Sequence, residues 1–111
     1  MSNVFQRIID GGLPCDKVFE NDRILAFHDI NPVAPVHILI VPKKSIPNIQ
    51  SANSSDLDLV KEMVEVVQKL ASEYEIADGY RLLINNGADA GQTVDHLHFH
   101  LIGGRRLGRM A

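Results

Sequence analysis

The sequence has little of three things that often assign a small protein to a class: cysteine, long apolar runs and an excess of positive charge. Cys15 is the single cysteine, so no internal disulfide can form. A lone thiol fits a reducing cytosol better than a secreted setting. We therefore expect a cytoplasmic protein in which Cys15 is a small, partly buried filler.

The charge balance and the short apolar runs exclude two further classes. Eleven Lys and Arg residues against 14 Asp and Glu residues give a net charge of -3, which argues against a nucleic-acid binder with a broad basic face. The longest apolar runs, such as residues 38–41, are far too short to span a bilayer. The N-terminus also has no apolar leader segment. The sequence therefore predicts one soluble domain, 1–111, without a nucleic-acid or membrane partner.

The hydrophobic pattern predicts an α+β fold. A short N-terminal helix is expected to end at Gly11-Gly12. Strands are expected at residues 17–20, 24–28, 36–41, 80–84 and 96–102. Because most connections between them are short, we expect a five-stranded, mostly antiparallel sheet with one long central helix on one face.

The long helix is expected to begin near Ser54–Ser55. Both serines are good N-caps, and Asp58 lies three residues after the second one. The expected buried stripe alternates steps of three and four, at residues 57, 60, 64, 67, 71 and 74. Beside it, Met63, Val66 and Leu70 form an apolar surplus that predicts a homodimer.

The most informative stretch of the chain has three histidines at alternate positions, His96, His98 and His100. The residues between them are apolar, which is typical of a half-buried strand with its imidazoles on one face and Leu97, Phe99 and Leu101 in the core. Imidazole titrates near neutral pH. A row of three therefore suits nucleophilic attack and proton transfer.

A metal site is an alternative use of these histidines. On a strand, His96 and His100 would lie roughly 13 Å apart, beyond easy reach of one ion with ~2.1 Å bonds. A site made from this strand alone would therefore be strained. His37 or Asp29 could still complete a site with one histidine pair, so metal binding stays open as a minority alternative.

The run His96-Leu97-His98-Phe99-His100-Leu101-Ile102 resembles the His-φ-His-φ-His-φ-φ motif of the histidine triad superfamily, where φ is apolar. Four further segments are similar, in order and in spacing, to those of its nucleotide-binding, purine phosphoramidase branch; they span residues 26–30, 34–37, 41–44 and 91–94. The resemblance covers almost the whole chain. It implies the histidine triad fold and a metal-free, cofactor-free hydrolase.

The resemblance also implies catalytic roles. His98 would be the nucleophile that forms a nucleotidyl-histidine intermediate. His100 would contact the phosphate and give a proton to the leaving amine. His37 and His96 would support the orientation and protonation of the nucleophile, and the Gly91 carbonyl would hold the second ring nitrogen of His98.

For the nucleotide, the resemblance implies that Asp29 accepts the ribose hydroxyls, although a turn residue is the plainer interpretation. Asn85 and Thr93 would lie on the phosphate side. A turn is the alternative for Asn85, for which the functional interpretation is moderately favoured, and an ordinary strand start is the alternative for Thr93. The remaining nucleotide-binding positions are Phe27, His28, Ile30, Gly91 and Gln92, with Ile8 and Phe19 as weaker candidates for the base pocket.

Three features depart from this pattern or fall outside it. Ser45 stands where relatives often have a histidine, and the tail lacks the tryptophan with which some relatives end, so the preferred leaving group is open. The segment Gly103–Arg106 opens no helix and is interpreted as a turn before a tail, not as a phosphate loop.

The predicted activity is cleavage of the P–N bond in purine nucleoside phosphoramidates, such as AMP-linked amines. A nucleotide sensor or scaffold and a metal-dependent hydrolase remain the alternatives.

Overall fold

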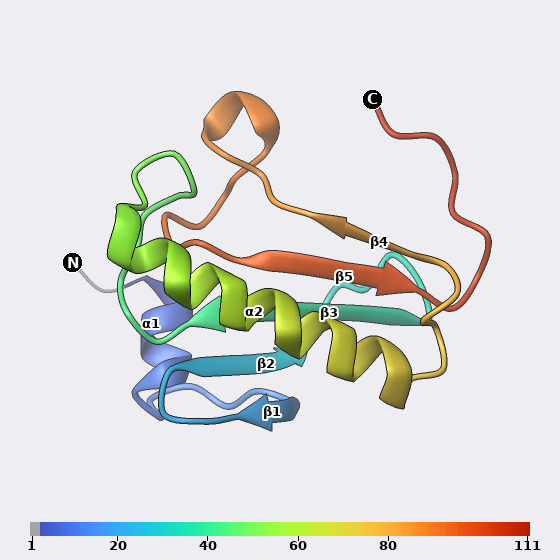
Figure 1. Cartoon of the computed structure of the whole chain (residues 1–111), viewed down its shortest axis with the longest axis horizontal. Coiled ribbons are helices and arrows are strands. Elements are labelled where there is room, and N and C mark those ends of the chain that lie inside the picture. The colour runs from blue at the N-terminus through green and yellow to red at the C-terminus, as the bar shows by residue number, and fades with distance from the viewer. Residues whose placement is uncertain (1–2) are drawn as a thin grey trace.

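The computed structural model describes residues 3–111 and contains one five-stranded sheet in the order β1-β2-β3-β5-β4. Every neighbouring pair of strands is antiparallel. The long helix α2 crosses one face of the sheet, and the short helix α1 lies on the other side near the chain start (Figure 1). The elements are α1 Val4–Ile9, β1 Lys17–Glu20, β2 Ile24–His28, β3 Val36–Pro42, α2 Ser54–Glu73, β4 Tyr80–Leu83, the 3-10 turn η1 Ala88–Ala90 and β5 Phe99–Gly103. The predicted α+β fold is confirmed.

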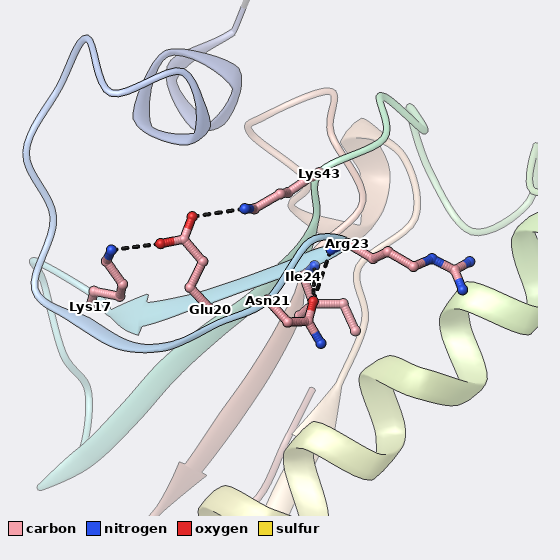
Figure 2. A network of polar contacts seen from close by, with 6 residues as sticks. All are labelled: Lys17, Glu20, Asn21, Arg23, Ile24 and Lys43. Carbon is pink, nitrogen blue, oxygen red and sulfur yellow. Dashed lines mark hydrogen bonds and ion pairs between the residues drawn. The ribbon is translucent and has the colours of Figure 1, made fainter.

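The hairpin β1–β2 forms where the sequence predicts it because its polar turn satisfies its own backbone. The Asn21 side-chain oxygen accepts hydrogen bonds from the amides of Arg23 and Ile24, at 2.9 and 2.8 Å. Glu20 pairs with both Lys17 and Lys43, at 2.6 and 2.8 Å (Figure 2). These two lysines hold the pKa of the Glu20 carboxyl down at about 2. The turn therefore fastens the edge strand β1 to the end of β3.

The two faces of the sheet have different cores. Beneath α2, the alternate β3 residues Ile38 and Ile40 pack with Phe99 and with the helix residue Met63. On the opposite face a smaller cluster contains Phe5, Leu25, Phe27, Leu39 and Val41. Among the helices of residues 3–111, α1 alone packs on that second cluster, together with the loop residues Cys15 and Val94, so no long helix covers this face.

The helix α2 corrects two sequence predictions. Its N-cap is Asn53, which forms a capping box with Asp56, and not Ser54 or Ser55. Asn is as good an N-cap as Ser, and an acid three residues later completes either box, so spacing alone did not decide between them. Asp56 is further paired with Lys44, which lowers the pKa of its carboxyl.

The buried face of α2 matches the predicted stripe only in part: Val67 and Ala71 are buried as expected. Met63, Val66 and Leu70 are buried in the core, whereas Leu57 and Val64 are 51% and 36% exposed. The apolar surplus is therefore not what would face a second subunit. Met63, Val66 and Leu70 follow helical spacing just as Leu57 and Val64 do. The periodicity alone therefore did not decide which of these apolar positions face the sheet.

Four strand ends differ from the predictions, and in two of them the strand is longer: β3 ends at Pro42 and β5 ends at Gly103, each one residue later than expected. The strand β5 begins at Phe99, so His96 and His98 lie in the irregular segment before it. The strand β4 ends at Leu83, one residue before the expected end. In residues 3–111, no helix is long and apolar enough to cross a membrane.

Candidate active site

The three histidines lie on the less covered face of the sheet. Leu97, Phe99 and Leu101 are at most 1% exposed and belong to the core beneath α2, as the alternation predicts. His96 and His98 are buried on the other side, and His100 is partly exposed. Burial therefore decreases along the row from His96 to His100.

His98 is oriented by one backbone carbonyl. Its Nδ1 lies 2.7 Å from the carbonyl oxygen of His96. Because a carbonyl only accepts, Nδ1 carries the proton in the neutral ring and the Nε2 lone pair is left free. The expected partner, the Gly91 carbonyl, is wrong: the extended segment before β5 supplies a carbonyl from only two residues away. Gly91 instead lies at the end of η1, where its amide donates to Ala88.

His96 joins the row to the end of β3. Its Nε2 lies 2.8 Å from the carbonyl oxygen of Pro42, so Nε2–H donates and Nδ1 is an acceptor. The Asn3 side-chain amide lies 3.4 Å from that Nδ1. Burial is the main cause that lowers the pKa of His96. The neutral His96 ring thus anchors this segment to Pro42, and the backbone carbonyl of His96 orients His98.

His37 meets His100 across the pair of strands β3 and β5. The register places His37 opposite Ile102 and Leu39 opposite His100, so the two histidines are diagonal neighbours on one face. His37 Nε2 lies 3.0 Å from His100 Nδ1 and 3.5 Å from an Asp29 carboxylate oxygen. Its Nδ1 accepts a hydrogen bond from the Val33 amide at 3.2 Å.

The environment keeps these two imidazoles neutral at pH 7. Burial, and then the neighbouring His98 and His37, lower the pKa of His100 to about 4. Burial also lowers the pKa of His37, against an opposing effect of the Asp29 carboxylate. A negatively charged phosphate next to His100 would stabilise the imidazolium and raise its pKa again. Protonation of His100 can therefore be coupled to substrate binding.

The same three side chains could hold a metal ion. One ligand atom from each of Asp29, His37 and His100 lies within 4.8 Å of the others. Neutral histidines and a carboxylate are suitable ligands for a divalent transition metal. The structure thus assembles the histidine pair and the acid that the metal alternative requires, drawn from two strands and a loop.

An apolar cavity of about 230 Å³ lies beside the row. Phe27, His28, Asp29, Ile30 and Ile8, all expected at a nucleotide site, line it. The remaining lining residues were not predicted as site residues: Val4, Phe5, Pro14, Cys15 and Leu39. Its lining is mainly hydrophobic with a few polar groups, as is usual for small-molecule sites.

Phe5 is the most consequential of the residues that sequence reasoning missed. Its ring packs edge-on against His98, with centroids 4.8 Å apart, and against Phe27 at 5.8 Å. It therefore forms the wall between the cavity and the histidine row. In the sequence Phe5 is one apolar residue of a short helix, and no local signal marks it as part of a site.

Two of the expected base-pocket residues make contacts outside the cavity. The His28 ring packs edge-on against Tyr74 at the end of α2, and its Nε2 lies 3.3 Å from the tyrosine hydroxyl. Phe19 packs against the core beneath α2. His28 lines the cavity but is separate from the row, and Phe19 is not among the residues that line the cavity.

The loop before β5 lies outside the cavity lining. Gln92 is buried, and its amide accepts from Gly87 and donates to the carbonyls of Pro47 and Val94, at 2.8, 2.8 and 3.0 Å. Gln92 therefore holds the loop in shape. Gly91 and Thr93 are exposed and Asn85 is half-buried. None of these four residues lines the cavity, and their contacts with a nucleotide stay predictions.

Comparison with known proteins agrees with this geometry. The HIT domain family model matches residues 11–107. A HIT-like protein of Chlamydia pneumoniae is 55% identical over 108 residues, which cover 97% of this chain and 98% of the relative. The structure of a HIT family hydrolase from Legionella pneumophila is 42% identical, with a TM-score of 0.94 and 96% of each chain covered. A histidine triad nucleotide-binding protein from Candida albicans is 31% identical with a TM-score of 0.83, covering 99% of this chain and 86% of the other. The row of His96, His98 and His100 at the start of β5 agrees with these matches. The matches show that the chain belongs to the HIT family.

Proposed function

We propose that the protein hydrolyses the P–N bond of purine nucleoside phosphoramidates, with AMP-linked amines as the best substrates. One observation carries the proposal: the His96 carbonyl fixes the proton of His98 on Nδ1 and leaves Nε2 as a nucleophile beside an apolar cavity. The match to solved HIT family hydrolases supports a hydrolytic role.

The proposed reaction has two steps. His98 Nε2 attacks the phosphorus, a new P–N bond to the imidazole forms, and the bond to the amine breaks. His100, protonated next to the substrate phosphate, gives its proton to the departing amine nitrogen. Water then attacks the same phosphorus, the bond to His98 breaks, and the nucleoside monophosphate leaves.

The cavity would hold the nucleoside. Phe27 and Ile30 would contact the purine, and the Asp29 carboxylate would accept the ribose hydroxyls. The phosphate would then lie toward His98 and His100, with Asn85 and Thr93 on its far side. The mainly apolar lining supports binding of a flat aromatic base over binding of a sugar or a peptide.

The direct test is incubation with an adenosine 5'-phosphoramidate of an alkylamine, with and without a chelator, while AMP release is followed. We expect release to survive exhaustive chelation, because a histidine nucleophile and a histidine acid suffice for the chemistry. Loss on chelation with recovery on zinc addition would instead support the metal-dependent alternative, with Asp29, His37 and His100 as ligands.

A variant of the nucleophile separates an enzyme from a nucleotide sensor. His98→Ala is expected to bind AMP but to lose turnover by roughly 10⁴-fold or more, because covalent catalysis is not easily bypassed. Lys61→Ala, an exposed residue of α2 that does not line the cavity, is the control, and its kcat should stay near that of the unsubstituted protein. Wild-type kcat in His98→Ala would place the chemistry elsewhere.

We propose a cytoplasmic homodimer as the working state. Support comes from apolar side chains that are exposed on the outer side of α2, Leu57 and Val64, and on the sheet-edge strand β4, Tyr80 and Leu82. A second copy could cover both groups. Sedimentation at micromolar concentration tests this, and a monomer would refute it.

A further inference from the structure

The loop of residues 29–35, between β2 and β3, bears on both the cavity and the histidine row, yet little packing holds it. Ile30 and Val33 are 91% and 58% exposed. Its anchors are hydrogen bonds: the Asp29 amide donates to the His37 carbonyl at 2.9 Å, and the Val33 amide donates to His37 Nδ1 at 3.2 Å. The position of this loop therefore depends on a few polar contacts.

The Val33 carbonyl, on the other side of the residue from the N–H that meets His37, is bound by the segment after β5. Arg105 Nη2 donates to the Val33 carbonyl at 2.8 Å, and Arg105 Nη1 donates to the Arg106 carbonyl at 2.9 Å. One guanidinium thus joins two segments that are far apart in sequence and lie at the same end of the sheet (Figure 1). The sequence indicated only a turn leading to a tail.

Gly104 allows this approach. Its φ is +94°, which favours glycine, and a Cβ built there would lie 3.0 Å from Pro35 Cβ. The backbone after β5 therefore passes directly against the end of the loop. Among the ion pairs of residues 3–111 none involves Arg105, so its hydrogen bonds go to carbonyls and not to a carboxylate.

The contacts beyond Val33 fix the positions of protons. Because the Val33 amide donates to His37 Nδ1, the proton of neutral His37 must be on Nε2. That Nε2–H points at His100 Nδ1, 3.0 Å away, and makes it an acceptor. Neutral His100 then carries its proton on Nε2. The Val33 carbonyl and the Val33 N–H belong to neighbouring peptide groups that meet at the Val33 Cα. Arg105 on the carbonyl therefore acts on the N–H by fixing the backbone position of Val33.

We propose that Arg105 is a positioning residue: by holding the Val33 carbonyl it places the Val33 N–H against His37 Nδ1, and so fixes the tautomer of His37 and thereby the side of His100 on which its proton lies. The kinetic part of this proposal rests on the proposed function. The tautomer part concerns the ligand-free protein and is independent of any substrate.

The test compares Arg105→Ala and Arg105→Lys with Arg106→Ala, a neighbouring exposed arginine whose side chain makes none of these contacts. Nitrogen-15 NMR of the His37 ring reads the tautomer directly. We expect the Nε2–H form in the unsubstituted protein and in Arg106→Ala, a mixture of tautomers in Arg105→Ala, and a partial return in Arg105→Lys. An unchanged His37 tautomer in Arg105→Ala would overturn the proposal.

Kinetics give a second readout. With an alkylamine leaving group, Arg105→Ala should lose about tenfold in kcat, the effect of one charge-assisted hydrogen bond, while KM changes less. Leaving groups that depart unprotonated should show a smaller loss. Equal losses for every leaving group would contradict an action through His100. If the unsubstituted protein hydrolyses no phosphoramidate while the tautomer still shifts in Arg105→Ala, the proposed function fails and the role of Arg105 stands.

Val33→Pro guards against an indirect effect of losing the arginine. Proline removes the N–H that holds His37 but keeps the carbonyl that Arg105 binds. We expect the same mixture of His37 tautomers as in Arg105→Ala. A melting temperature near that of the unsubstituted protein is required of each variant. A preserved Nε2–H tautomer of His37 in folded Val33→Pro would show that the Val33 N–H does not fix that tautomer.

Discussion

His98 and His100 lie two positions apart, but their surroundings give them different chemistry. His98 is held by a carbonyl and packs against Phe5, so its free nitrogen has one direction. His100 is held by another imidazole, and burial lowers its pKa to about 4. The first arrangement suits a nucleophile, and the second suits a group that takes up a proton only with a bound anion.

The substitution His100→Gln tests this division. An alkylamine must be protonated as it leaves, whereas a more stable leaving group departs as it is. We expect His100→Gln to slow hydrolysis of alkylamine substrates far more than that of substrates with easily departing groups, because His98 is intact. Rates across a leaving-group series would show this, and a uniform loss would mean that His100 only binds the phosphate.

Single residues show how far the sequence could predict the site. The family motif identified His37, His96, His98 and His100, and the structure brings them into one row. The partner of His98 Nδ1 was predicted wrongly, because which carbonyl meets a ring depends on backbone direction and not on residue type. Phe5 and Arg105 gave no local signal, since each acts across a gap in sequence that only the fold closes.

At the scale of elements, polar turns were better predictors than apolar periodicity. The hairpin β1–β2 was predicted to the residue because Asn21 can close the turn with its own side chain. The helix α2 was predicted, but its buried face only in part: Val67 and Ala71 are buried as expected, whereas the apolar positions Leu57 and Val64 are exposed. Contact with the sheet selects Met63 and Leu70 over Leu57.

Two alanine variants of α2 test this assignment. Met63→Ala leaves a cavity in the core and is expected to lower the free energy of unfolding by about 2–5 kcal/mol. Leu57→Ala, on the exposed side, should change it by less than about 0.5 kcal/mol in the monomer. Urea unfolding measures both, and a larger effect at Leu57 would restore the stripe expected from the sequence.

For the whole molecule, the buried histidines link stability to pH. The pKa values of His37, His96 and His100 are lowered from 6.5, that of His100 to about 4, so the unfolded chain binds more protons than the folded one in that interval. Their contribution is complete above pH 6.5 and is lost as the pH falls. The lowered carboxyl pKa values of Glu20 and Asp56 add to this loss only below their unfolded values, 4.5 and 3.8.

We therefore expect the free energy of unfolding to fall from pH 7 to pH 5. The slope approaches roughly 1.4 kcal/mol per pH unit for each histidine that is protonated in the unfolded chain alone. Urea unfolding at a series of pH values measures it. His100→Gln removes one of the three groups and should make the slope shallower, whereas an unchanged slope would show that His100 is not the titrating group.

The helix α1 covers the histidine face with a single buried side chain, Phe5. Six residues are too few for a helix to be stable alone, so α1 persists only while Phe5 stays docked beside His98. Its amide hydrogens should exchange with solvent much faster than those of β3 or β5. A nucleotide in the cavity would touch the same helix through Val4 and Ile8, and should slow that exchange. The exchange rate of the α1 amides would then report whether the cavity is occupied.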